Sequence, residues 1–84
     1  MAQINFEIEF RYDEDGQNGN RNSIFHLVAC INISNMEEIK YPISAKYING
    51  MVMYDVDRLK NDFPMEQFRR ELIMELKQFV RSEV

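Results

Sequence analysis

The sequence contains little cysteine, proline and glycine, and each shortage excludes a class of protein. One Cys in 84 residues rules out an intramolecular disulfide, and three Gly with two Pro are too few for a collagen-like or low-complexity chain. No hydrophobic run approaches the ~20 residues of a membrane span, and the chain starts with a strand-like alternation rather than a signal peptide. We therefore expect a cytoplasmic protein with no membrane contact.

The charge balance argues against nucleic acid as a partner. Lys and Arg number 10 against 14 Asp and Glu, which leaves a net charge of −4 that repels phosphate. Basic residues near the C-terminus, such as Arg69 and Arg70, alternate with Glu66 and Glu71, as on a solvated helix face. For a chain of this size we expect one domain, residues 1–84, whose partner is a protein or a second copy of itself.

Two strands are predicted in the first half of the chain. Residues 3–12 alternate between apolar even positions and polar odd ones, which is the period of a half-buried strand. Residues 13–22 hold no apolar side chain and two of the three Gly, which is typical of a solvated loop. The alternation resumes over residues 23–34 with apolar odd positions. The even positions there are only partly polar: Ile24, His26, Val28 and Cys30.

The dipeptide Asn49-Gly50 marks a change of phase. Apolar side chains occupy odd positions before it, as at Tyr47, and even positions after it, as at Val52. A two-residue type I′ turn explains the change, because residues whose numbers sum to 99 then face each other. A one-residue bulge at Gly50 in a single long strand would also change the phase, and we favour the hairpin. Pro42 lacks an N–H, so its strand lies at an edge or begins there.

A polar stretch, residues 57–62, leads into a predicted amphipathic helix of about twenty residues. Asp62 is the candidate N-cap, and Pro64 suits the first turn, where its missing N–H costs little. The apolar residues that follow recur at steps of three and four: Met65, Phe68, Leu72, Leu76 and Phe79, with Ile73 and Val80 widening the stripe. Such a helix can cover one face of a sheet.

These elements predict an α+β fold of two layers, a four-stranded antiparallel sheet in the order β-β-β-β-α with one C-terminal helix on one face. The expected core consists of the helix stripe and the strand residues Phe6, Ile8, Leu27, Ala29, Ile43 and Tyr54. No second helix is available for the other face of the sheet. We therefore predict that this uncovered face binds a partner, through Val28, Cys30, Ile48, Met51 and Met53.

Signals for catalysis or metal binding are weak. Residues 13–18 have acidic or amide side chains at alternate positions, as a calcium loop does, but Gly16 is fourth in this stretch where such a loop has Gly sixth, and no Glu stands at the twelfth position. His26 and Cys30 share a strand face, yet two ligands do not make a zinc site. Asp55 and Asp57 could form a carboxylate pair on one strand, but nothing in the sequence positions a nucleophile or a substrate phosphate beside them. We expect neither an enzyme nor a bound cofactor or metal.

Several short motifs resemble those of the SecB export chaperones and their short relatives. The resemblance comprises Tyr41-Pro42 leading through a strand to Gly50, then Phe63-Pro64, and a helix that carries Phe68-Arg69-Arg70-Glu71-Leu72-Ile73. It implies a chaperone-like chain that assembles into a tetramer and binds client polypeptides in grooves.

Two functional hypotheses follow. The first is a non-enzymatic protein-binding or self-associating module, possibly SecB-like, that uses the uncovered sheet face as a homodimer. The alternative is a small acidic inhibitor, from a phage or mobile element, of a basic nucleic-acid-binding enzyme. Its carboxylates would come from the first strand and the loop after it: Glu7, Glu9, Asp13, Glu14 and Asp15.

Overall fold

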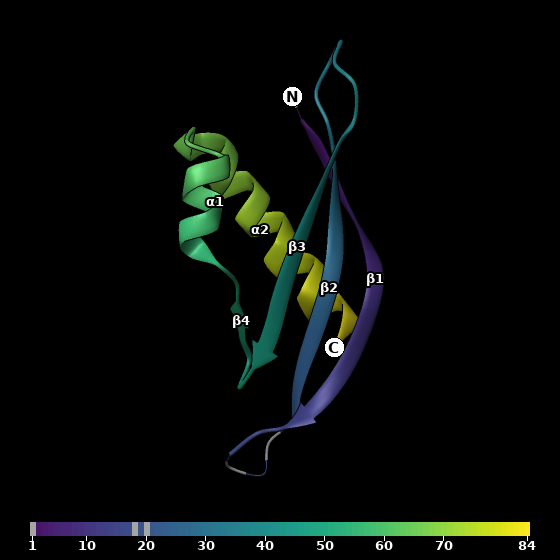
Figure 1. Cartoon of the computed structure of the whole chain (residues 1–84), viewed down its shortest axis with the longest axis vertical. Coiled ribbons are helices and arrows are strands. Elements are labelled where there is room, and N and C mark those ends of the chain that lie inside the picture. Colours follow the sequence, from purple (N-terminus) through teal and green to yellow (C-terminus); the bar gives the residue numbers. More distant parts are fainter. Residues whose placement is uncertain (1, 18, 20) are drawn as a thin grey trace.

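The computed structural model describes residues 2–17, 19 and 21–84. Its elements follow the order β1 (Gln3–Asp15), β2 (Arg21–Asn32), β3 (Ile39–Ile48), β4 (Met51–Met53), α1 (Val56–Asp62) and α2 (Glu66–Glu83). The strands form an antiparallel sheet in the order β1-β2-β3-β4, and α2 passes obliquely across one face of it (Figure 1). The predicted α+β class and four-stranded antiparallel sheet are confirmed.

The first hairpin is longer than the sequence pattern indicated. β1 continues to Asp15 and β2 begins at Arg21, so the predicted loop over residues 13–22 shortens to residues 16–20, of which 18 and 20 lie outside the described residues. Asp13 pairs with Ser23 in this extension, and the Ser23 hydroxyl donates to the Asp13 carboxylate at 2.9 Å. These strand ends project beyond the core, so both of their faces are polar and no hydrophobic alternation marks them.

A bulge in β1 overturns the prediction that its even positions all share one face. Ile8 pairs with Leu27, but Phe10 pairs with His26, so Glu9 is an extra residue in β1. Because successive strand residues point to opposite faces, one inserted residue exchanges the faces of everything after it. Phe6 therefore faces the helices, whereas Phe10 and Tyr12 face the opposite side of the sheet.

The hairpin at Asn49-Gly50 is confirmed, and the alternative of a bulged single strand is wrong. Asn49 and Gly50 have φ of 51° and 79°, as a type I′ turn requires, and Tyr47 pairs with Val52 in the expected register. β4 ends at Met53, so the expected pairs of residues 54–56 with β3 do not form. Pro42 lies where β3 pairs only with β2, which agrees with the expected edge position.

A short helix replaces the polar connection predicted over residues 57–62. Asp55 caps α1, because its Oδ1 accepts the backbone N–H of Arg58 at 3.1 Å, and Leu59 is buried at 2% exposure. Leu59 is the one buried residue among the seven of α1, so no repeat of apolar residues at steps of three and four marks this helix in the sequence. The sequence therefore did not predict it. Asp62 ends α1 and does not cap α2, which begins after Met65 without a side-chain cap.

The core lies between the sheet and the two helices. Its largest side chains that are fully shielded from water are Phe25, Leu27, Ile31, Leu59, Leu72, Leu76 and Val80. Phe6 and Tyr54 are partly buried against them, as expected. Ile8 is 40% exposed beside the bulge and Met65 is 73% exposed before α2, so neither belongs to the core or stripe predicted for it. Within the described residues, neither helix combines the length and apolar character that crossing a membrane needs.

Candidate interaction face of the sheet

The surface of the sheet turned away from α1 and α2 is here called the open face. The strand register places all five predicted partner-binding residues on it: Val28, Cys30, Ile48, Met51 and Met53. Met51 and Met53 are 61% and 48% exposed, whereas Val28 and Ile48 are half-buried. Cys30 is only 5% exposed, so neighbouring groups already cover its side chain. The accessible apolar surface at this end of the sheet therefore comes chiefly from the two methionines.

Aromatic side chains extend this apolar surface onto β1 and β2. Phe10 stacks on the His26 ring with centroids 4.4 Å apart and an interplanar angle of 8°, and Tyr12 stacks on Phe10 at 5.6 Å. Phe10 remains 54% exposed and Tyr12 43% exposed. The sequence alone did not assign either aromatic to this face, because the alternation runs unbroken through Glu9 and carries no sign of the bulge.

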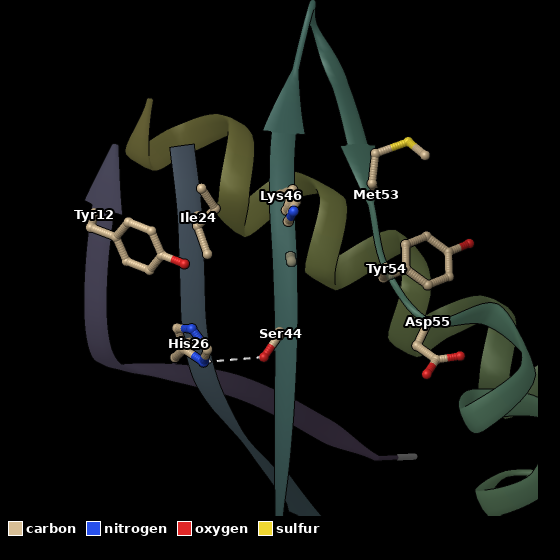
Figure 2. A pocket seen from close by; sticks show the side chains of 9 residues that line it. Tyr12, Ile24, His26, Ser44, Lys46, Met53, Tyr54 and Asp55 are labelled. Atoms are coloured by element: carbon tan, nitrogen blue, oxygen red, sulfur yellow. Dashed lines mark hydrogen bonds between the residues drawn. The ribbon is translucent and has the colours of Figure 1, made fainter. Parts of the chain in front are cut away.

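A shallow hollow of about 350 Å³ lies beside the aromatic cluster (Figure 2). Its lining comprises Tyr12, Ile24, His26, Ser44, Ala45, Lys46, Met53, Tyr54 and Asp55. His26 Nδ1 and Ser44 Oγ are 3.2 Å apart across β2 and β3. A serine nucleophile would need a base that a third group orients, and within the described residues no carboxylate lies at hydrogen-bonding distance from His26. The pair forms a cross-strand hydrogen bond, and the lining of the hollow is mostly apolar.

The chemistry of Cys30 is that of a packed residue. Burial of the side chain, with a further contribution from the nearby Glu7 carboxylate, raises the pKa of the Cys30 thiol above its ordinary value. The thiol therefore stays protonated at neutral pH, and a thiol is neither a good nucleophile nor a metal ligand. In the part of the chain that the structure describes, no three His, Cys, Asp or Glu side chains come together as a metal site would require.

The five carboxylates proposed for the acidic alternative all lie on β1 but do not form one surface. Glu7 and Glu14 belong to the open face, whereas Asp13 and Asp15 point to the other side. Glu14 lies 3.9 Å from Lys46 Nζ, and Asp13 accepts from Ser23. The negative charge is thus divided between two faces and partly offset within the chain.

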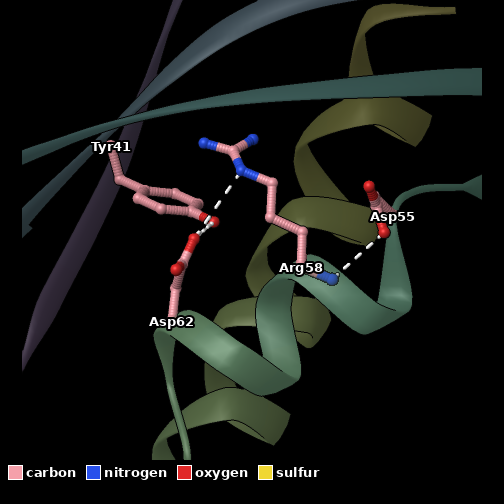
Figure 3. Close-up of polar contacts among 4 residues, drawn as sticks. All are labelled: Tyr41, Asp55, Arg58 and Asp62. Carbon is pink, nitrogen blue, oxygen red and sulfur yellow. Dashed lines mark hydrogen bonds and ion pairs between the residues drawn. The ribbon is translucent and has the colours of Figure 1, made fainter.

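A polar cluster joins α1 to β3 (Figure 3). The Tyr41 hydroxyl donates to Asp62 Oδ2 at 2.5 Å, and the Arg58 guanidinium lies 4.5 Å above the Tyr41 ring and 3.6 Å from the same carboxylate. Burial and the hydrogen bond to Asp62 raise the pKa of Tyr41 to about 12. A phenol that holds its proton so firmly is no general base, so we interpret the cluster as an anchor for α1. Asp55, whose pairing with Asp57 was considered above, serves instead as the cap of α1.

Comparison with protein-family models, with curated proteins and with solved structures finds no match for this chain.

Proposed function

We propose that this chain is a non-enzymatic protein-binding module that associates with a second copy of itself through the open face. The observation that carries this proposal is the group of exposed apolar side chains on that face, namely Phe10, Tyr12, Met51 and Met53. Apolar side chains gathered on one face of a small domain mark an interface more often than a free surface. The thioether of methionine adapts to the shape of its partner, which suits such a contact.

The strand register makes the open face complementary to a second copy of itself. A two-fold axis parallel to the strands and midway between β2 and β3 lays β1 of one copy over β4 of the other. Tyr12, Ile24, Lys46 and Met53 are in register across the sheet. Tyr12 of one copy therefore falls opposite Met53 of the other. Two sheets packed face to face in this way lie about 10 Å apart.

Measurement of mass in solution by sedimentation tests the proposal. We expect the wild-type chain to be a dimer. Met53→Asp should weaken the dimer by at least about a hundredfold, since each of the two copies loses the burial of one such side chain, which contributes about 1.5 to 3 kcal/mol. Met74→Asp is the matched control, because Met74 is equally accessible at 50% but lies on α2, away from the open face.

The outcomes distinguish self-association through the open face from a general effect of added charge. A wild-type chain that sediments as a monomer at millimolar concentration would refute self-association. Equal loss of dimer in Met53→Asp and Met74→Asp would mean that added charge, and not the open face, is responsible. Circular dichroism verifies that each variant is folded. Met51→Asp, at a position 61% exposed, supplies a second open-face variant if Met53→Asp does not fold.

The acidic-inhibitor hypothesis has less support, because the carboxylates of β1 are divided between two faces. Its test is charge reversal at Glu7 and Glu9, which should slow association with a basic target and reduce its salt dependence. The SecB-like assembly stays a prediction of the sequence resemblance. It would require a mass above that of a dimer in the same sedimentation experiment.

A further inference from the structure

A second surface, independent of the open face, lies between the outer edge of β1 and α2. Two adjoining hollows of about 390 and 350 Å³ share Ile4, Asn5 and Glu75 in their linings, so together they form one continuous groove. Glu71 lines it at one end, and Phe79 with Ser82 at the other. Beyond that end, Arg11 Nη1 donates to the carbonyl of Glu83 at 2.7 Å and ties β1 to the end of α2.

One wall of the groove is an unpaired strand edge. β1 is the outermost strand of the sheet and pairs only with β2, so every second residue turns its N–H and C=O outward. The regular part of β1, Gln3–Ile8, ends at the bulge and spans roughly 20 Å at 3.3 Å per residue. This edge offers backbone hydrogen bonds to about five or six residues of an added strand.

The other wall of the groove carries uncompensated negative charge. Glu71 and Glu75 lie one helical turn apart on α2, and both are partly buried. Neither carboxylate forms an ion pair or a hydrogen bond with any described residue, while the nearby Arg70 pairs with Glu66 at 2.8 Å. Like charges four residues apart destabilise a helix. A cation placed in the groove would remove this repulsion.

We propose that the groove binds an extended basic segment of a partner protein, which adds to β1 as a fifth strand. Glu71, Glu75 and Phe79 are successive positions four residues apart on α2, with about 6 Å between neighbours. Alternate side chains of a strand are about 6.7 Å apart, so three of them match this spacing. Antiparallel addition, which pairs slightly better than parallel, predicts the order apolar-x-basic-x-basic in the bound segment. The apolar side chain then meets Phe6 and Phe79, whose rings are 5.4 Å apart.

Fluorescence anisotropy with a synthetic peptide, Thr-Leu-Thr-Lys-Thr-Lys-Thr-amide with a fluorophore on its N-terminus, tests the proposal on the full chain. We expect saturable binding that weakens with salt and disappears when both Lys are replaced by Glu. Glu71→Gln combined with Glu75→Gln should weaken binding about tenfold, because the double variant loses the binding free energy of two partly exposed ion pairs with the peptide lysines. The matched control, Asp57→Asn with Glu66→Gln, removes the same charge outside the groove and should leave binding within about twofold.

Backbone methylation separates strand addition from simple charge attraction. N-methyl groups on the peptide residues whose N–H groups face β1 should abolish binding, whereas methylation of the alternate residues should leave it intact. Amide resonances of Gln3–Ile8 should shift on titration, and those of Met51 and Met53 should not. Absence of binding, equal effects of the two double variants, indifference to the methylation register, or shifts confined to the open face would each overturn the proposal. None of these outcomes depends on whether the chain dimerises.

Discussion

The anchor between α1 and β3 provides the sharpest test of the fold. Tyr41→Phe removes only the hydroxyl that donates to Asp62 at 2.5 Å, and it keeps the ring beneath the Arg58 guanidinium. Asp62 retains Arg58 at 3.6 Å, so its charge is not left without a partner. The substitution therefore reports on a single hydrogen bond between a phenol and a carboxylate.

The size of the effect is that of one partly exposed hydrogen bond. The rise of the Tyr41 pKa from 10.0 to about 12 is caused first by burial of the phenol and then by the hydrogen bond, so it does not measure the hydrogen bond alone. The Asp62 side chain is 43% exposed, so water screens the interaction. We accordingly expect Tyr41→Phe to lower the free energy of unfolding by about 1 kcal/mol at neutral pH, near the average for a protein hydrogen bond.

The same pKa predicts how this contribution changes with pH. The folded-state pKa of Tyr41 lies above the unfolded value, so the stabilisation is complete below pH 10 and is lost as the pH rises from about 10 to about 12. The stability difference between wild type and Tyr41→Phe should shrink across that window. In parallel, the ultraviolet difference spectrum of the two proteins should place the ionisation of Tyr41 above that of an ordinary tyrosine.

Urea denaturation at several pH values measures both effects. Tyr54→Phe is the matched control, since Tyr54 is also partly buried and its hydroxyl makes no hydrogen bond to a described residue. Equal stabilities for wild type and Tyr41→Phe, or a difference that does not change up to pH 12, would refute the anchor. Hydrogen exchange of Val56–Asp62 should accelerate in Tyr41→Phe if the hydroxyl holds α1 against the sheet.

Two further predictions concern single residues. Gly50→Val should lower the free energy of unfolding by about 1 to 3 kcal/mol, because Gly50 has φ of 79°, and Gly50→Asn should cost less since Asn tolerates this conformation; equal urea midpoints for wild type and Gly50→Val would contradict this. Cys30 in the folded protein should react with iodoacetamide at least tenfold more slowly than in urea, because burial raises its pKa and blocks access; equal rates would show that the thiol is accessible.

Some features of the chain could be predicted because their causes are local. Asn49 and Gly50 both have positive φ, the conformation that this dipeptide favours in a two-residue turn, so the hairpin and its register follow from two residues and a count. The apolar stripe of α2 could be predicted for the same reason, because its residues recur at helical spacing. Leu72, Leu76 and Val80 in this stripe are all fully buried. The exposure of Met51 and Met53 on the open face follows from the hairpin register combined with the place of this stripe.

The composition of the candidate surfaces depends on contacts between distant segments. Apolar and polar residues continue to alternate without interruption through Glu9. The sequence pattern is therefore the same for a regular strand and for the bulged strand that the structure has. The bulge becomes visible only where β1 pairs with β2 at His26, and it alone brings Phe10 and Tyr12 to the open face. The sequence therefore predicted the face that lacks a covering helix but missed its two exposed aromatics.

The turn at Asn49-Gly50, the antiparallel sheet and the amphipathic α2 follow from the amino-acid order alone, because backbone sterics and hydrophobic periodicity act within a few residues. Only the tertiary structure determines three other features. These are the position of the bulge, the presence of α1, and the placement of Glu71 and Glu75 beside the edge of β1. Each of these depends on packing between segments far apart in the sequence. For example, Tyr41 and Asp62 are 21 residues apart and hold α1 in place. Such contacts leave no period in the sequence, so they become apparent only once the chain has folded.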